Sequence, residues 1–261
     1  MKIVAHPALR AFVEENLTEG RSPESVAGRI RTHEKHLPPI SADSIERFIR
    51  SVYGRKIEAY RDRMRAKRKW KRKRPKVTQL ANRKFIDLRP KIIERRARVG
   101  DAEADFVVSG KTGKGMILAL IDRKLRAVFL ELVLPVSVAN VHCAFLHIKA
   151  HYPELKTIST DNDILFEKHE ELERMLGVPI YFCHPYHSWE KGSIENANRE
   201  IRKTIPKGSD ISQYSKKCIA RIEEQINDRY MACLNYRTPH EALQRYRKQK
   251  QRREALEKKK R

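Results

Sequence analysis

Residues 103–134, EADFVVSGKTGKGMILALIDRKLRAVFLELVL, decide the fold of this 261-residue chain. EADFVVSG, GMILALIDR and RAVFLELVL are apolar runs of strand length. The intervening DRKLR has the character of a hairpin turn between the second and third runs. Together they predict a three-stranded meander.

The residues that follow alternate between helical and strand patterns. We expect helices over 137–152, 164–177 and 192–205, and short strands over 155–160 and 178–185. The element order is β-β-β-α-β-α-β-α, which fits an α/β fold with a mixed five-stranded sheet and helices on its faces. In that fold the first and fourth strands are neighbours at the centre of the sheet.

The charge of the chain is unevenly distributed. The net charge is +24, yet residues 101–206 hold 13 Lys/Arg and 15 Asp/Glu, so that the remaining 155 residues carry +26. Such a balance implies a polyanionic partner, with nucleic acid as the default. A basic protein that binds RNA without being an enzyme stays open as an alternative.

Several protein classes fit the sequence poorly. No apolar run approaches the ~18 residues of a membrane span, so we expect no membrane partner. The first residues, MKIVAHPALRAF, lack the apolar run and small-residue cleavage site of a signal peptide. The four cysteines contain no C-x-x-C pair, which argues against a zinc finger or a disulfide scaffold and suits a reducing cytosol.

The segment 1–55 has the pattern of three short helices. Ser22 and Pro23 resemble an N-cap and a first helical residue. The third helix presents Ser44, Arg47 and Arg50 on its outer face, which fits a helix-turn-helix that binds DNA. A small helical bundle with a solvated face is the alternative.

Basic segments flank the predicted core. Residues 56–100 form a basic linker, in which RAKRKWKRKR (65–74) has eight Lys/Arg in ten positions. We expect its side chains to contact phosphates and Trp70 to stack on a base or sugar; a solvated tail is the alternative. The residues of this run that we expect to contact DNA are Arg65, Arg68, Trp70 and Arg72. The core then spans 101–208, and residues 209–261 form a helical, basic C-terminal extension.

Three acids stand out by position. Asp105 lies inside an apolar strand, Asp161 ends the fourth strand in TISTDND (157–163), and Glu195 lies in the first turn of the last core helix. If the three acids converge, their carboxylates provide oxygen ligands for Mg²⁺. Two such ions side by side promote phosphodiester cleavage. The alternative is that each acid is a turn or capping residue. The same helix carries three further polar residues on the adjoining face, Asn198, Arg199 and Arg202.

Several blocks of the sequence resemble a known family. They include SPESVAGRI, ISADSIERFI, RVGDAEADFVV, TISTDND, YFCHPYHSWEKGSIENANREIRK, PKGSD and LNYRTPHEAL. The chain is similar over about residues 22–243 to bacterial insertion-sequence transposases of the insertion-sequence 30 family, which have an RNase H-like D-D-E core. The family acids map onto Asp105, Asp161 and Glu195, with 33 residues between the last two.

The resemblance implies a reaction and its partners. It implies a fold with an RNase H-like mixed five-stranded sheet, and a catalytic site that takes two Mg²⁺ or Mn²⁺ ions. The reaction would be nicking at transposon ends and attack of the freed 3′-OH on target DNA. The partners would be double-stranded DNA and further copies of the chain, in the bacterial cytoplasm at the nucleoid. The family's basic residue, seven beyond the glutamate, maps onto Arg202, and we expect Arg199 and Arg202 to contact DNA.

The sequence also departs from the family pattern. Ala102 stands where the family usually has Trp, and Asp163 where it usually has Gly. Many relatives also carry additional N-terminal DNA-binding sequence. These departures favour an alternative in which the chain is a truncated or domesticated, catalytically inactive DNA-binding relative.

Overall fold

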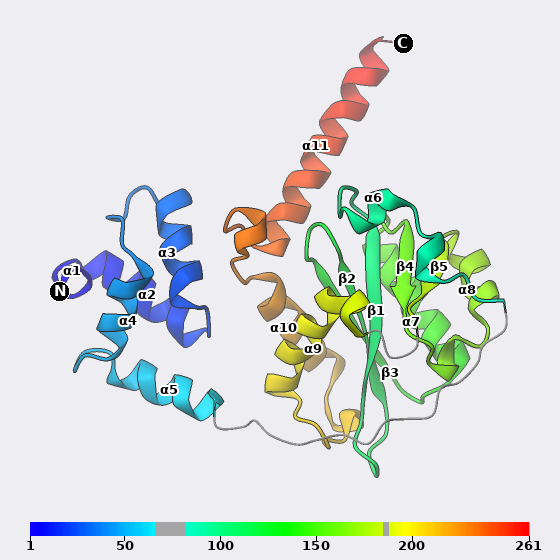
Figure 1. Ribbon diagram of the computed structural model, residues 1–261, viewed down its shortest axis with the longest axis horizontal. Helices are drawn as coiled ribbons and strands as arrows, with labels where there is room; N and C mark the ends of the chain where they lie inside the picture. The colour runs from blue at the N-terminus through cyan, green and yellow to red at the C-terminus, as the bar shows by residue number, and fades with distance from the viewer. Residues whose placement is uncertain (66–81, 185–187, 261) are drawn as a thin grey trace. The chain divides into compact units, whose positions relative to one another are not determined.

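The computed structural model describes residues 1–65, 82–184 and 188–260, which fall into two compact units (Figure 1). The first unit comprises Met1–Lys73 together with Asp228–Arg261, and the second comprises Arg74–Asn227. The sheet and its covering helices belong to the second unit.

The second unit is built on one five-stranded sheet with the order β3-β2-β1-β4-β5. β1 is antiparallel to β2, and β2 is antiparallel to β3, whereas β4 is parallel to both β1 and β5. The predicted RNase H-like mixed sheet is therefore confirmed, with β1 at its centre. The strands are β1 Asp101–Val108, β2 Met116–Asp122, β3 Val128–Val133, β4 Thr157–Thr160 and β5 Ile180–Phe182.

Helices cover both faces of this sheet. One face packs on α9 and α10 through a cluster that includes Ile117, Ile194 and Ile222. On the other face Tyr152, which follows α7, stacks on Phe129 of β3 with ring centroids 4.6 Å apart. The helices of this unit are η1 Ile86–Leu88, α6 Lys91–Glu94, α7 Val138–His151, η2 Ile164–Phe166, α8 His169–Leu176, η3 Ser188–Lys191, α9 Gly192–Thr204, η4 Ile211–Gln213 and α10 Lys216–Asn227.

The strand register decides which acids face α9. Asp105 pairs with Ala119, and Glu103 pairs with Ile121. Ala119 and Ile121 belong to the cluster under α9. Because residues two apart on a strand share a face, Glu103 and Asp105 both lie on the α9 side of the sheet.

The N-terminal part of the first unit is helical. Its elements are α1 Lys2–Ala5, α2 Pro7–Thr18, α3 Pro23–Thr32, α4 Ala42–Ile49 and α5 Arg55–Arg65. Ser22 caps α3 by accepting a hydrogen bond from the Ser25 amide, with Pro23 as the first helical residue, as the sequence predicts. The basic linker is expected to start at residue 56, but residues 55–65 form helix α5. This helix packs on the unit through Ile57, which is buried in its core.

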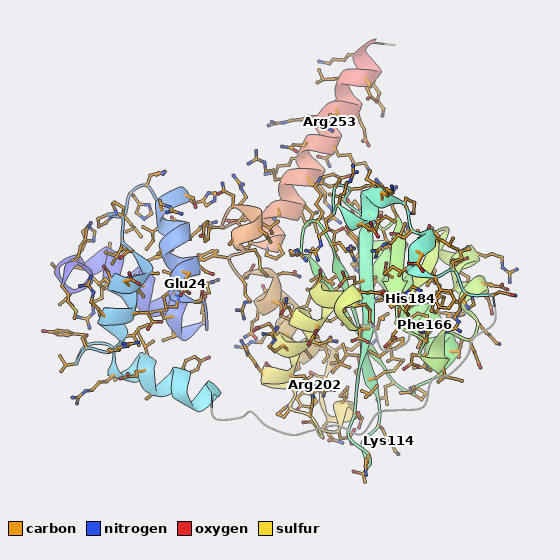
Figure 2. All side chains as sticks on the ribbon, viewed as in Figure 1. Glu24, Lys114, Phe166, His184, Arg202 and Arg253 are labelled. Atoms are coloured by element: carbon orange, nitrogen blue, oxygen red, sulfur yellow. The ribbon has the colours of Figure 1, made fainter. Side chains whose placement is uncertain are left out.

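The C-terminal segment of the first unit contains η5 Ala232–Leu234 and α11 Pro239–Lys260. α11 has 22 residues and lies within the C-terminal segment that the sequence predicts to be helical and basic. No Gly or Pro follows Pro239, and nothing in the sequence interrupts the helix. Arg253 lies on the exposed outer half of α11 (Figure 2).

None of the helices that the structure describes has a stretch long and apolar enough to cross a membrane.

Candidate active site

Asp105 and Asp161 converge on one cation of the chain itself. The Lys191 ammonium lies 3.3 Å from Asp105 Oδ1 and 3.3 Å from Asp161 Oδ2. Asp105 comes from the middle of β1, Asp161 follows the end of β4, and Lys191 immediately precedes α9. The predicted convergence of the two aspartates is thus visible as a shared ion pair.

The charges in this cluster influence one another. Burial acts to lower the pKa of Lys191, but the carboxylates of Asp105 and Asp161 outweigh it and raise that pKa, so the ammonium stays charged. Burial raises the pKa of Asp105, and the Lys191 charge opposes this shift. The side chain of Lys191 is 10% exposed, whereas that of Asp161 is 47% exposed. The cluster therefore opens to solvent on the Asp161 side.

Neighbouring oxygens are left without protein partners. Asn198 of α9 donates to Asp105 Oδ2 at 2.6 Å, and this bond orients the carboxylate. Asp161 Oδ1 and Asn198 Oδ1 are buried and accept no hydrogen bond from the part of the chain that the structure describes. Buried oxygens are seldom left unpaired, and hard divalent cations prefer such oxygens as ligands. This donor set fits a divalent metal ion.

Glu103 holds the start of α9 against the sheet. It is fully buried and accepts hydrogen bonds at Oε2 from the Ser193 and Ile194 amides, at 3.0 and 2.9 Å. Arg123 Nη1 lies 2.7 Å from the other oxygen, Oε1. Sequence reasoning missed Glu103, although its position two residues before Asp105 places it on the same face. It fixes the backbone that carries Lys191 and Glu195.

Glu195 does not join the two aspartates in this conformation. It lies in the first turn of α9, as expected, and its side chain is exposed. Within residues 1–65, 82–184 and 188–260, no group of three or more His, Cys, Asp or Glu side chains could hold a metal ion. The role of Glu195 as a third ligand stays a prediction, and so does the three-acid site.

The two departures in the sequence have distinct structural roles. Asp163 Oδ1 accepts a hydrogen bond from the Leu165 amide at 2.9 Å and so caps η2. Burial raises the pKa of Asp163 and the nearby Asp161 charge adds to the effect. Ala102 is fully buried in β1, paired with Asp122 on one side and Ile158 on the other.

The residues predicted to contact DNA lie in different places. In α4, Arg47 is exposed and donates to Ser44 at 3.3 Å, and Arg50 is exposed just after the helix. Arg199 is exposed on α9, whereas Arg202, marked in Figure 2, donates to the carbonyls of Val108 and Pro206. Arg68, Trp70 and Arg72 lie outside the described residues, and so does the side chain of Arg65.

His184 belongs to a cluster with Phe85, Asp87 and Glu190. Its ring, labelled in Figure 2, stacks on Phe85 with centroids 5.2 Å apart. Its Nε2 lies 2.8 Å from Asp87 Oδ2, and its Nδ1 lies 3.2 Å from Glu190 Oε1. The Glu190 carboxylate also accepts the His184 amide at 3.0 Å, so the residue fastens the end of β5 to η3.

Comparison with known proteins gives several relatives. No protein-family model matches the chain. The transposase for insertion sequence element IS4351 of Bacteroides fragilis is 36% identical over 251 residues, which cover 92% of this chain and 74% of that protein. Transposase InsI for insertion sequence element IS30A of Escherichia coli is 29% identical over 250 residues, covering 91% of this chain and 64% of that protein.

The probable transposase for insertion-like sequence element IS1161 of Streptococcus salivarius is 35% identical over 147 residues, and the match spans 42% of its length. Among solved structures, the catalytic core domain of BIV integrase is similar with a TM-score of 0.45 and 17% identity. That similarity covers 58% of this chain and 97% of the integrase domain.

Proposed function

The chain belongs to the bacterial insertion-sequence transposases, in the insertion-sequence 30 family, and we propose that it binds the ends of a mobile element, nicks them, and joins the freed 3′-OH to target DNA. Both steps are phosphoryl transfers, one with water and one with a DNA hydroxyl as nucleophile. The observation that carries the proposal is the meeting of Asp105 and Asp161 around one cation.

The metal that the family implies fits this site. Asp105 and Asp161 would hold it, with the unpaired oxygens of Asp161 and Asn198 as further donors. When bound, one or two Mg²⁺ or Mn²⁺ ions would activate the attacking oxygen and stabilise the leaving oxygen. Glu195 is proposed as a third ligand, brought in by movement of its exposed side chain.

The remaining residues of the site position these ligands. Asn198 restrains the Asp105 carboxylate, and Glu103 anchors the first turn of α9 through two backbone amides. Arg123 neutralises the Glu103 charge beneath the site. Catalytic geometry depends on such supporting contacts because a small displacement of a ligand costs a large part of the rate.

DNA binding is proposed to involve both the helical unit and the basic segment. The proposed contacts are Ser44, Arg47 and Arg50 of the helical unit, the basic residues of the run 65–74, and Arg199 and Arg202 of α9. Phosphate neutralisation by these side chains gives affinity that falls steeply with salt. Because two element ends are joined, we propose by analogy a homo-oligomer on DNA in the bacterial cytoplasm.

The inactive DNA-binding alternative is not favoured. Asp163, the extra acid on which it relies, has a structural role as the cap of η2. The carboxylates needed for chemistry are retained and two of them converge. Family membership at 36% identity over 92% of the chain also favours the active reading.

A cleavage assay tests the proposal. The substrate is duplex DNA taken from the two flanks of the gene, where element ends would lie, incubated with Mg²⁺, Mn²⁺ or EDTA. Metal-dependent nicks at the element ends are expected from the wild type. Asp105→Asn, Asp161→Asn and Glu195→Gln are expected to lose nicking while retaining DNA binding in a mobility-shift assay.

Asp163→Asn is the matched control, because it alters an acid two residues from Asp161 that caps η2. It is expected to retain nicking. Equal nicking by the wild type and the Asp161→Asn variant, or none from any protein that binds the ends, would overturn the proposed activity.

A further inference from the structure

Lys191 pairs with the two carboxylates that a metal ion would need. Its ammonium lies at 3.3 Å from an oxygen of each aspartate. A Mg²⁺ ion bound by the same two oxygens would lie about 2.0–2.1 Å from each of them. The Lys191 ammonium and a metal ion would therefore compete for the same two carboxylates.

The position of Lys191 is set by the scaffold. The residue ends η3 and immediately precedes α9. Two and three residues later, the Ser193 and Ile194 amides donate to the buried Glu103 carboxylate. The backbone beside Lys191 is therefore held against β1, and its side chain is 10% exposed. A surface lysine that met the aspartates by chance would lack this support.

The charge balance explains what the lysine does. Asp105 and Asp161 without a counter-ion would place two negative charges close together in a partly buried site, which is unfavourable. With the Lys191 ammonium present, the three groups carry one net negative charge. Exchange of that ammonium for a divalent ion leaves the metal and the two aspartates neutral. A second metal would then require further negative groups, which Glu195 and a DNA phosphate can supply.

We propose that Lys191 is the built-in counter-ion of the unloaded site, and that its ammonium must leave Asp105 and Asp161 before a divalent metal ion binds between them. This inference rests on the proposed metal-dependent function. In this proposal the two aspartates keep a balancing charge without metal, and metal binding exchanges one cation for another. Lys191 thus weakens metal affinity while it stabilises the empty protein.

The test measures metal binding without DNA or catalysis. Titration calorimetry with Mn²⁺ is performed on the wild type and on Lys191→Met, which keeps an unbranched side chain, one atom shorter, and removes its charge. We expect Lys191→Met to bind Mn²⁺ about tenfold more tightly or better, because a competing charge is removed. Its melting temperature without metal should fall, and added Mn²⁺ should raise it more than in the wild type.

Lys203→Met is the matched control. Lys203 lies near the end of the same helix α9 and pairs with Glu200 at 2.6 Å on the surface. Its removal changes the net charge equally but is expected to leave Mn²⁺ affinity unchanged. Asp161→Asn added to Lys191→Met should abolish the gain in affinity, which locates the gain at this site.

The outcomes separate the inference from the proposed function. Metal-dependent nicking by the wild type, with equal or weaker Mn²⁺ binding by Lys191→Met, would overturn the counter-ion role alone. If neither protein binds Mn²⁺ and the wild type does not nick, both ideas fail.

If Lys191→Met does not fold, a crystal structure of the wild type with Mn²⁺ decides. The anomalous peak should lie between the two aspartates with Nζ displaced; a peak with Nζ still bridging them would overturn the exchange.

Discussion

Gly28 is a buried residue of α3 that lies against the ring of Tyr236. A Cβ at this position would come 2.0 Å from a ring carbon of Tyr236, so the ring would have to move. We expect Gly28→Ala to lower the free energy of unfolding by about 1–3 kcal/mol, the usual range for overpacking. Urea unfolding of the full chain measures the change.

The control for Gly28 is Gly192→Ala, because nothing lies within 4 Å of a Cβ at Gly192. That variant should be as stable as the wild type. Tyr236→Ala should lower the free energy of unfolding less in the Gly28→Ala background than in the wild type, because removing the ring makes room for the added methyl group. Full stability of Gly28→Ala alone would contradict the observed packing.

Glu223 of α10 links the stability of the second unit to pH. Burial raises the pKa of Glu223 to about 7, from an ordinary value of 4.5; Glu131 adds to the shift, whereas His151 and the Leu130 amide oppose it. Because the pKa of Glu223 is higher in the folded state, its protonated form stabilises the fold. This contribution to the free energy of unfolding is fully present below pH 4.5 and is lost as pH rises through 7.

The corresponding prediction compares unfolding free energies between pH 4.5 and pH 8. From pH 4.5 to pH 8, the free energy of unfolding of the wild type should fall by up to ~3 kcal/mol more than that of Glu223→Gln. One pKa unit corresponds to ~1.4 kcal/mol. Glu224→Gln, at an exposed neighbouring position, should follow the wild-type profile. Parallel profiles for wild type and Glu223→Gln would show that Glu223 does not carry the effect.

At the scale of elements, α10 protects the open edge of the sheet. β3 is an edge strand that pairs with β2 on one side. On its other side, its backbone bonds side chains of α10. Asn227 accepts from the Val128 amide at 2.8 Å and donates to the Val128 carbonyl at 2.7 Å, and Glu223 accepts from the Leu130 amide. These bonds satisfy backbone groups that could otherwise pair with another chain.

Replacing Asn227 tests this edge. Asn227→Leu keeps the size of the side chain but leaves both Val128 groups unpaired, so we expect a loss of about 1–3 kcal/mol in unfolding free energy. Light scattering on heating should show earlier association than in the wild type. Gln225→Leu, an exposed position on the same helix, should change neither quantity appreciably. Equal behaviour of the two variants would argue against the edge role.

The strands were predictable because their patterns are local. Apolar runs separated by turn residues indicate the meander, and the element order indicates that β1 and β4 are neighbours, as observed. The ion pair of Lys191 was not predictable, because residues 105, 161 and 191 meet only through the sheet and the anchoring of α9. The role of Glu103 was not predictable for a similar reason. In the sequence alone, an acid inside a strand only interrupts the apolar pattern, and its partner Arg123 is known only from the structure.

At the scale of the chain, the two terminal segments fold together in one unit. Arg29 of α3 donates to both oxygens of Glu241 in α11, at 2.8 and 2.9 Å, across 212 positions of sequence. The guanidinium groups of Arg21 and Arg29 also lie over the ring of Tyr230, 4.5 and 4.8 Å from its centroid. The C-terminal segment thus completes the N-terminal helical unit, which no local pattern could have indicated.

The Arg29–Glu241 pair is the last test, because it measures how strongly the termini are joined. A double-mutant cycle with Arg29→Met and Glu241→Gln should give a coupling energy of about 1–3 kcal/mol, since bidentate, charge-assisted pairs are strong and Arg29 is largely covered. Arg10 and Glu14 are also 2.8 Å apart, but both side chains are 37% exposed and four residues apart in one helix.

A cycle on Arg10 and Glu14 should therefore give no more than about 0.5 kcal/mol. Coupling at Arg29–Glu241 that is no larger than at this surface pair would mean that the terminal segments are held together by the aromatic and apolar contacts instead. In that case Tyr230→Ala, rather than loss of the ion pair, should release the C-terminal segment, which limited proteolysis would detect as early cleavage within residues 228–240.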